Sequence, residues 1–209
     1  MVRSVLFDVD GTLLDTNEYI YQAFEHTLNT YGAPTSRETM KVHMGKLLHH
    51  MYEIFAPSHN AESLAQTHRE FQEKNTYLAT VFPHVIETLE KLRASNIKIA
   101  AVTTRSRESC IATLDHTGLH QLLDVVVTGD DVQKHKPDPE PLNKALAALG
   151  ARASEAFMVG DTSIDVFAGK NAGVKTIAVT YGFHAETVAN SNPDHVVASI
   201  REILPLVLG

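Results

Sequence analysis

Residues 5–16 read VLFDVDGTLLDT, and this stretch decides how the rest of the chain is interpreted. The apolar run 5–7 is typical of a buried strand. It ends at two carboxylates one residue apart, Asp8 and Asp10, and Gly11 bends the chain before the next apolar segment. Like charges repel, and carboxylates beside a core need a partner or a cation. The stretch therefore predicts a binding site at the end of a strand, with an acidic surface turn as the alternative.

Composition indicates an ordinary soluble globular protein. The chain has 209 residues, of which 44% are hydrophobic and 21% charged, so it can form one domain with a large core, or a core with a small insert. The formal net charge is −7 and there is no basic run. This balance argues against nucleic acid or anionic membranes as partners.

Cysteine usage and hydropathy point to a cytoplasmic protein. The single cysteine, Cys110, rules out an internal disulfide, fits a reducing compartment and is expected to be a small buried residue. No apolar run reaches the roughly 18 residues of a membrane span, and the N-terminus leaves no room for a signal peptide before Asp8. We expect a monomer or a small homo-oligomer.

Residues 17–80 have a helical pattern with no strand. Ile20, Phe24, Leu28 and Tyr31 fall on one face of a helix, which Gly32 and a following proline end. Three further helices are expected at 36–44, 47–55 and 61–77.

After Phe82 the pattern changes to strands alternating with helices, which predicts βαβ units and a parallel sheet. Strands are expected at 97–102, 125–127, 157–159, 176–179 and 196–197. Helices are expected from Pro83, from 106 or 107 to 118, and at 139–149, 162–172 and 200–207, the last interrupted by Pro205. The predicted fold is α/β, a Rossmann-like parallel-sheet core (1–16 and 81–209) with a small helical cap (17–80) inserted after the first strand.

Polar side chains gather where these strands end, and ligands of open α/β sheets bind at that edge. The candidates are Asp8, Asp10, Thr103, Thr104, Arg105, Lys136, Asp161 and Asp165. Four carboxylates in one pocket require a cation, and oxygen ligands favour Mg²⁺, whereas no histidine or cysteine is placed there for zinc. A hydroxyl and a lysine suit a bound phosphoryl group.

The motifs, in order, are Asp8-Val9-Asp10-Gly11-Thr12, a strand ending in Thr103, Lys136-Pro137, and Gly160–Asp165. Together they resemble all four motifs of the haloacid dehalogenase-like phosphatases, and the match covers nearly the whole chain.

The resemblance implies a role for each motif residue. Asp8 is expected to be the nucleophile that forms an aspartyl-phosphate, and Asp10 the general acid and then the general base. Mg²⁺ is expected to be held by the Asp8 carboxylate, the Asp10 carbonyl oxygen, Asp161 and Asp165. Thr103, Thr104 and Lys136 are expected to bind the phosphoryl oxygens.

Single residues favour phosphoester hydrolysis over other reactions of the family. Asp10 argues against dehalogenases and phosphonate hydrolases, which lack an aspartate there. Thr12 and Ile20 argue against sugar-phosphate mutases, which commonly have valine and histidine at those places. The open alternatives are a pyrophosphatase, a sugar-phosphate phosphotransferase or mutase, and a non-catalytic binding module.

The cap is expected to contact the part of the substrate beyond the phosphate. The candidate residues are Lys41, His43, Gly45 and Lys46. Gly45 and the segment 179–184 resemble phosphoglycolate phosphatases, and that segment also resembles related pyrophosphatases. We therefore expect a small phosphorylated metabolite as substrate, with phosphoglycolate first and pyrophosphate second. A metal site among His43, His49 and His50 is disfavoured, because solvated helix histidines are the default.

Overall fold

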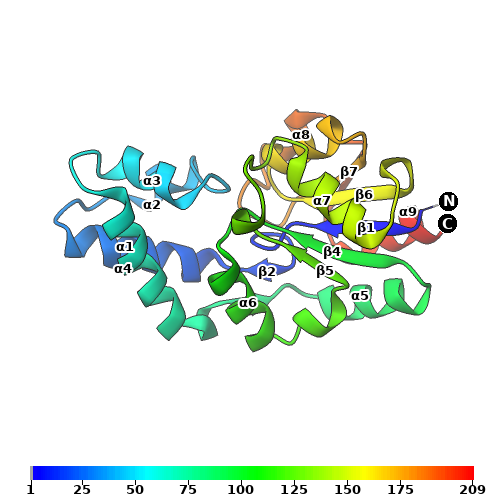
Figure 1. Cartoon of the computed structure of the whole chain (residues 1–209), viewed down its shortest axis with the longest axis horizontal. Helices are drawn as coiled ribbons and strands as arrows, with labels where there is room; N and C mark the ends of the chain where they lie inside the picture. The colour runs from blue at the N-terminus through cyan, green and yellow to red at the C-terminus, as the bar shows by residue number, and fades with distance from the viewer. Residues whose placement is uncertain (1) are drawn as a thin grey trace.

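The computed structural model of the chain describes residues 2–209, and its centre is a parallel sheet (Figure 1). The order of the six strands is β5-β4-β1-β6-β7-β8, and every neighbouring pair is parallel. The strands are β1 (Ser4–Phe7), β4 (Lys98–Val102), β5 (Val125–Val127), β6 (Ala156–Gly160), β7 (Lys175–Val179) and β8 (His195–Val197). The predicted α/β class is confirmed.

The strand β1 lies in the middle of this sheet and is buried at all four positions. It pairs with β4 on one side and with β6 on the other, so that Ser4 faces both Lys98 and Ala156. The chain runs from β1 to β4 and β5 on one side and then crosses to β6, β7 and β8 on the other, and ligand sites of such folds form at the carboxyl end of the strand where the order reverses. The segments that follow β1, β4 and β6 are therefore neighbours.

Helices cover both faces of the sheet, because alternate side chains of each strand point to opposite faces. Val5, Phe7 and Ile99 pack under α5 (Val85–Ala94), α6 (Arg107–His116) and α9 (Ile203–Leu208). Leu6, Ala100 and Met158 pack under α7 (Glu140–Leu149) and α8 (Ser163–Asn171). No described helix has both the length and the apolar character needed to cross a membrane.

Four of the five α-helices between β1 and β4 form a group of their own, at the end of the molecule away from both termini (Figure 1). They are α1 (Asn17–Thr30), α2 (Arg37–Lys41), α3 (Leu48–Phe55) and α4 (Ala61–Lys74). Phe24, Met40, Tyr52 and Leu64 are buried in their shared core. We call residues 17–80 the helical insert.

A second, two-stranded sheet joins the helical insert to the rest of the chain. Its strands, β2 (Leu14–Asp15) and β3 (Thr80–Val81), pair antiparallel. The sequence did not predict this sheet, because two residues are too few to show the alternation of a strand.

Several predicted helix boundaries are wrong. Instead of reaching 44, α2 ends at Lys41, and the turn that follows contains Gly45 at φ +87°. The helix predicted from Pro83 begins at Val85, because His84 has a left-handed backbone (φ +68°) that a helix does not allow.

The two helices predicted over 61–77 and 200–207 are each divided. Lys74 ends α4, and a 3₁₀ turn follows at Thr76–Leu78. A 3₁₀ turn at Ile200–Glu202 precedes α9, and Pro205, which was expected to interrupt the helix, lies in the first turn of α9. Further 3₁₀ turns are His120–Leu122, Gly129–Asp131, Ala153–Glu155 and Val188–Ser191.

Candidate active site

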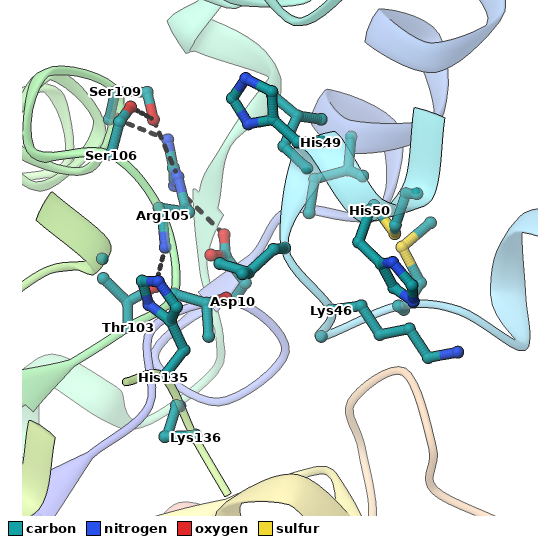
Figure 2. Close-up of a pocket in the computed structure, with 18 of the residues that line it drawn as sticks. Asp10, Lys46, His49, His50, Thr103, Arg105, Ser106, Ser109, His135 and Lys136 are labelled. Carbon is teal, nitrogen blue, oxygen red and sulfur yellow. Dashed lines mark hydrogen bonds and ion pairs between the residues drawn. The ribbon is translucent and has the colours of Figure 1, made fainter. Parts of the chain in front are cut away.

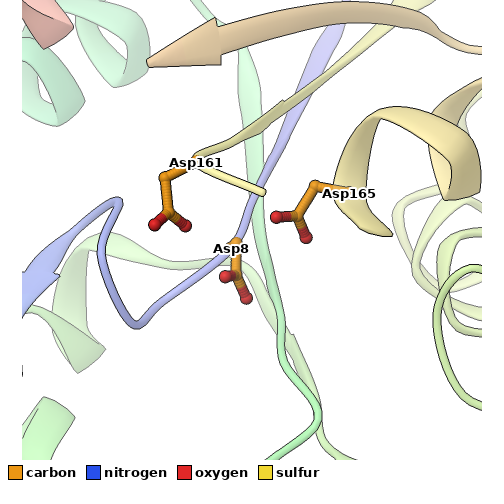
Figure 3. Close-up of side chains that lie close together, drawn as sticks. All are labelled: Asp8, Asp161 and Asp165. Carbon is orange, nitrogen blue, oxygen red and sulfur yellow. The ribbon is translucent and has the colours of Figure 1, made fainter. Parts of the chain in front are cut away.

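Three carboxylates converge at the carboxyl edge of the sheet (Figure 3). Asp8 follows β1, Asp161 follows β6, and Asp165 lies in the first turn of α8. Each offers an oxygen, and these oxygens lie within 4.8 Å of one another. Within residues 2–209 this is the one group of acids, histidines or cysteines close enough to hold a metal ion.

Asp165 is fixed in place by the start of its own helix. The backbone N–H and hydroxyl group of Thr162 donate to Asp165 Oδ2 at 3.1 and 2.6 Å. This is a capping arrangement, in which the third residue of the helix bonds back to the residue that caps it. The four-residue spacing between Asp161 and Asp165 therefore brings both carboxylates to one place, as the sequence predicts.

Lys136 lies buried between two of these acids. Its Nζ donates to Asp8 Oδ1 at 2.8 Å, to Asp165 Oδ1 at 2.6 Å and to the Val102 carbonyl oxygen at 3.0 Å. Burial disfavours the charged amine, but the attraction of Asp165 and Asp8 outweighs it and raises the Lys136 pKa. Lys136 therefore stays charged, and all three of its donors are used.

Negative charge nevertheless remains in excess. Burial, helped by the nearby Asp165 and Asp10, raises the pKa of Asp8 to about 7 in spite of Lys136. Burial and the charges of Asp165 and Asp8 raise the Asp161 pKa well above its usual range. A hard divalent cation would remove this cost, and a set of carboxylate oxygens is the donor set that Mg²⁺ prefers. The residues present thus fit a magnesium ion.

The segment 181–184 supports Asp161 from the side. The Phe183 backbone N–H donates to Asp161 Oδ2 at 2.7 Å. A Cβ on Gly182 would come within 2.2 Å of the Gly11 carbonyl oxygen and within 2.3 Å of Asp161 Oδ2. Only a glycine fits there, which is a physical reason for the Tyr181-Gly182-Phe183 run that the sequence analysis noted only as a resemblance.

Asp10 is not part of the cluster of three acids, and its side chain points toward Arg105 (Figure 2). The Arg105 Nη1 group lies 3.1 Å from Asp10 Oδ1. The sequence analysis placed Arg105 at the end of a strand but assigned it no role, because an ion pair between residues this far apart in the chain leaves no local pattern.

Asp8, Asp10, Thr103, Thr104 and Lys136 line one cavity of about 510 Å³. Thr103 is buried, and its hydroxyl oxygen accepts a hydrogen bond from the Arg105 backbone N–H at 3.2 Å.

The helical insert supplies the opposite wall of the cavity. Gly45 and Lys46 line it, whereas Lys41 and His43, which the sequence also proposed, are not among the lining residues. His43 instead contacts Lys46, with Nδ1 2.9 Å from Nζ. Further lining side chains of the insert include His49, His50, Glu53, His68 and Arg69.

Two histidines of the helical insert are paired with acids at the surface. His49 Nε2 lies 2.5 Å from a Glu62 oxygen, and His50 Nδ1 lies 3.3 Å from a Glu53 oxygen. His43, His49 and His50 form no metal-binding cluster in the described part of the chain.

Comparison with known proteins gives full-length relatives. The chain is 39% identical over 209 residues to pyrophosphatase PpaX of Halalkalibacterium halodurans, covering 99% of this chain and 97% of that one. It is also 39% identical over 208 residues to pyrophosphatase PpaX of Bacillus velezensis, covering 97% and 95%.

Solved structures agree in fold. A haloacid dehalogenase-like hydrolase from Bacteroides fragilis superposes with a TM-score of 0.87 at 26% identity, over 97% of this chain and all of that one. A predicted phosphoglycolate phosphatase from Haemophilus somnus gives a TM-score of 0.89 at 22% identity over 98% and 97%, which shows the fold alone. The family model of the haloacid dehalogenase-like hydrolases matches residues 5–179. The chain therefore belongs to the haloacid dehalogenase-like hydrolase family.

Proposed function

We propose that this protein is a Mg²⁺-dependent phosphohydrolase that splits pyrophosphate through a phosphorylated Asp8. The observation that carries the proposal is the position of Asp8. It lies in the cluster with Asp161 and Asp165, it is paired with Lys136, and it lines the cavity. A carboxylate with these neighbours is suited to nucleophilic attack on a phosphorus atom.

In this proposal Asp8 attacks one phosphorus atom, and the bond from phosphorus to the bridging oxygen breaks. Asp10 donates a proton to the leaving oxygen and then takes one from the water that attacks the aspartyl-phosphate. Thr103 and Thr104 hold the phosphoryl oxygens through hydrogen bonds, and Lys136 contributes its positive charge beside them.

Asp8, Asp161, Asp165 and the carbonyl group of Asp10 would hold the magnesium ion. When bound, Mg²⁺ supplies positive charge against the phosphoryl oxygens and the buried carboxylates. The charge that Lys136 provides is insufficient for this, because its donors already serve Asp8 and Asp165.

The relatives favour pyrophosphate over phosphoglycolate, which reverses the order expected from the sequence. The proteins at 39% identity over the full chain are named pyrophosphatases. The fold neighbours named for phosphoglycolate share only 21–22% of their residues with this chain. Lys46 and Arg69 on the insert wall are cations that suit a second phosphate group. Residues 17–80 then act as a cap over a core formed by 1–16 and 81–209.

The test is phosphate release from pyrophosphate and from 2-phosphoglycolate, measured side by side with and without Mg²⁺. The proposal expects Mg²⁺-dependent release with a clear preference for pyrophosphate. Asp8→Asn should abolish it, while Asp115→Asn, at an exposed position, should not. A preference for 2-phosphoglycolate would overturn the substrate, and full activity of Asp8→Asn would overturn the mechanism.

A further inference from the structure

Arg105 makes a nearly buried ion pair with Asp10. Its side chain is 11% exposed and that of Asp10 is 12% exposed, with Nη1 3.1 Å from Oδ1 (Figure 2). Both side chains line the cavity that also contains Asp8. At this depth an ion pair is held far more firmly than at the surface, because water competes less for either partner.

The guanidinium group is fixed by two helices besides Asp10. From α6, the Ser109 hydroxyl accepts from Nε at 3.3 Å, the Ser109 carbonyl accepts from Nη2 at 2.5 Å, and the Thr113 hydroxyl accepts from Nη1 at 3.1 Å. From α1, the Tyr19 hydroxyl accepts from Nη2 at 3.3 Å, and the guanidinium carbon lies 5.2 Å from the centre of the Tyr19 ring. Arg105 therefore offers Asp10 a rigid anchor.

Arg105 binds one carboxylate oxygen of Asp10 and leaves the second one available to a substrate or a water molecule. The ion pair uses Asp10 Oδ1, and Oδ2 accepts no hydrogen bond from the residues that the structure describes. The chemistry proposed for Asp10 needs one oxygen that can first give and then take a proton in a fixed place, since proton transfer requires hydrogen-bond reach. A carboxylate held by Oδ1 meets this requirement through Oδ2.

The other buried cation of the site, Lys136, makes no ion pair with Asp10 among the described residues. The three donors of Lys136 go to Asp8, Asp165 and the Val102 carbonyl oxygen. Arg105 has five donors in a planar fork, so it can bind Ser109, Thr113 and Tyr19 and still reach Asp10.

We propose that Arg105 is a positioning residue for Asp10: it holds Oδ1 so that Oδ2 meets the leaving oxygen and then the attacking water. This inference rests on the proposed function, in which Asp10 transfers the protons. In this account the Arg105 guanidinium group contacts the Asp10 side chain and not the Asp10 carbonyl group, and it touches neither the phosphoryl group nor the carboxylates of Asp8, Asp161 and Asp165.

The experiment separates the two half-reactions with acetyl phosphate as the probe. In the first, Asp8 takes the phosphoryl group and acetate leaves without needing a proton. In the second, water attacks the aspartyl-phosphate, a proton passes to Asp10, and inorganic phosphate leaves. Rapid acid quenching measures the phosphorylated enzyme, and phosphate release measures the second step. Only the second step depends on Asp10.

Arg105→Gln is expected to slow hydrolysis of the aspartyl-phosphate by roughly 100-fold, the lower end of what a positioned acid or base contributes. Phosphorylation should stay within about threefold, so that phosphorylated enzyme accumulates. Arg105→Lys should recover part of the lost rate, because it keeps the charge without the planar fork. Arg107→Gln, at an exposed ion pair two residues away, should change neither step.

The inference is overturned if Arg105→Gln slows both steps in parallel, which would indicate general damage to the site, or if it changes neither. Thermal unfolding is followed for each variant. If Arg105→Gln shows no cooperative unfolding transition, Thr113→Val and Tyr19→Phe take its place, because each keeps Arg105 and removes one of its hydrogen-bond partners. Each should slow hydrolysis of the aspartyl-phosphate more than phosphorylation, by a smaller factor than Arg105→Gln. A wild-type enzyme that forms no phosphorylated Asp8 would instead contradict the proposed function.

Discussion

The ammonium group of Lys136 lies 2.8 Å from the carboxylate of Asp8. It is also 2.6 Å from Asp165, so a single buried cation stands between two acids that follow different strands. This contact connects the third motif of the sequence to the first and the fourth. Lys136 thus supplies one positive charge at the place where the three carboxylates of Asp8, Asp161 and Asp165 meet.

Replacement of Lys136 by methionine should destabilise the protein. It leaves Asp8 and Asp165 buried without their cation, and loss of one partner from a buried ion pair costs about 3–5 kcal/mol. Thermal unfolding in EDTA at neutral pH should show the loss, and Mg²⁺ should reverse part of it. Lys134→Met, two residues away and largely exposed, should have little effect. An unchanged unfolding temperature for Lys136→Met would contradict this account of the site.

Binding of Mg²⁺ should strengthen as the pH rises through 7. Because burial raises the Asp8 pKa to about 7, Asp8 tends to be protonated below that pH in the metal-free protein, and burial shifts the Asp161 pKa in the same direction. A metal ion must then displace bound protons, so its affinity falls as the pH is lowered. Titration calorimetry at pH 6.5 in buffers of different ionisation enthalpy should detect proton release. Binding with no proton release would show that the carboxyls are already ionised.

Much of this arrangement can be predicted from the sequence, because it depends on strands and their ends. The apolar runs before Asp8 and Asp161 place both acids at one edge of a parallel sheet, and the spacing to Asp165 adds a third. These three side chains do converge in the structure. Their catalytic roles stay predictions.

Other parts of the site depend on contacts between distant segments and leave no local signal. Arg105 meets Asp10 across 95 positions of the chain, and the Phe183 N–H meets Asp161 across 22. The two-residue strands β2 and β3 are too short to show the alternation of apolar and polar residues that identifies a strand. Of the insert residues that line the cavity, the sequence analysis proposed only Gly45 and Lys46, because helix periodicity does not say which residues of a turn face another part of the chain.

Substitution of Gly182 by alanine should impair activity more than stability. The added methyl group would meet the Gly11 carbonyl oxygen and Asp161 Oδ2, so one of the proposed metal ligands must move. The measurement is the Mg²⁺ concentration needed for half-maximal phosphate release, which should rise at least severalfold. Gly32→Ala is the control: its Cβ has nothing within 4 Å, and its positive φ makes it strained without touching the site. Equal Mg²⁺ dependence in both variants would contradict the role given to this contact.

The insert wall offers a matched pair of lysines. Lys46 lines the cavity, whereas Lys41, five residues earlier, does not. Lys46→Ala should raise KM for pyrophosphate by about tenfold with a smaller change in kcat, since it would remove a cation that contacts the substrate in both the ground and the transition state. Lys41→Ala should leave both constants unchanged. The result that counts against this interpretation is a KM effect of similar size in the two variants.

The most direct test of the account is to look for the phosphorylated Asp8. The enzyme is mixed with pyrophosphate and Mg²⁺, quenched in acid within milliseconds, digested, and analysed by mass spectrometry. The account predicts one phosphoryl group on the peptide that contains Asp8, and none in Asp8→Asn or in EDTA. Two results would contradict the account. One is rapid turnover of pyrophosphate by the wild type with no phosphorylated peptide, and the other is equal turnover by the wild type and Asp8→Asn.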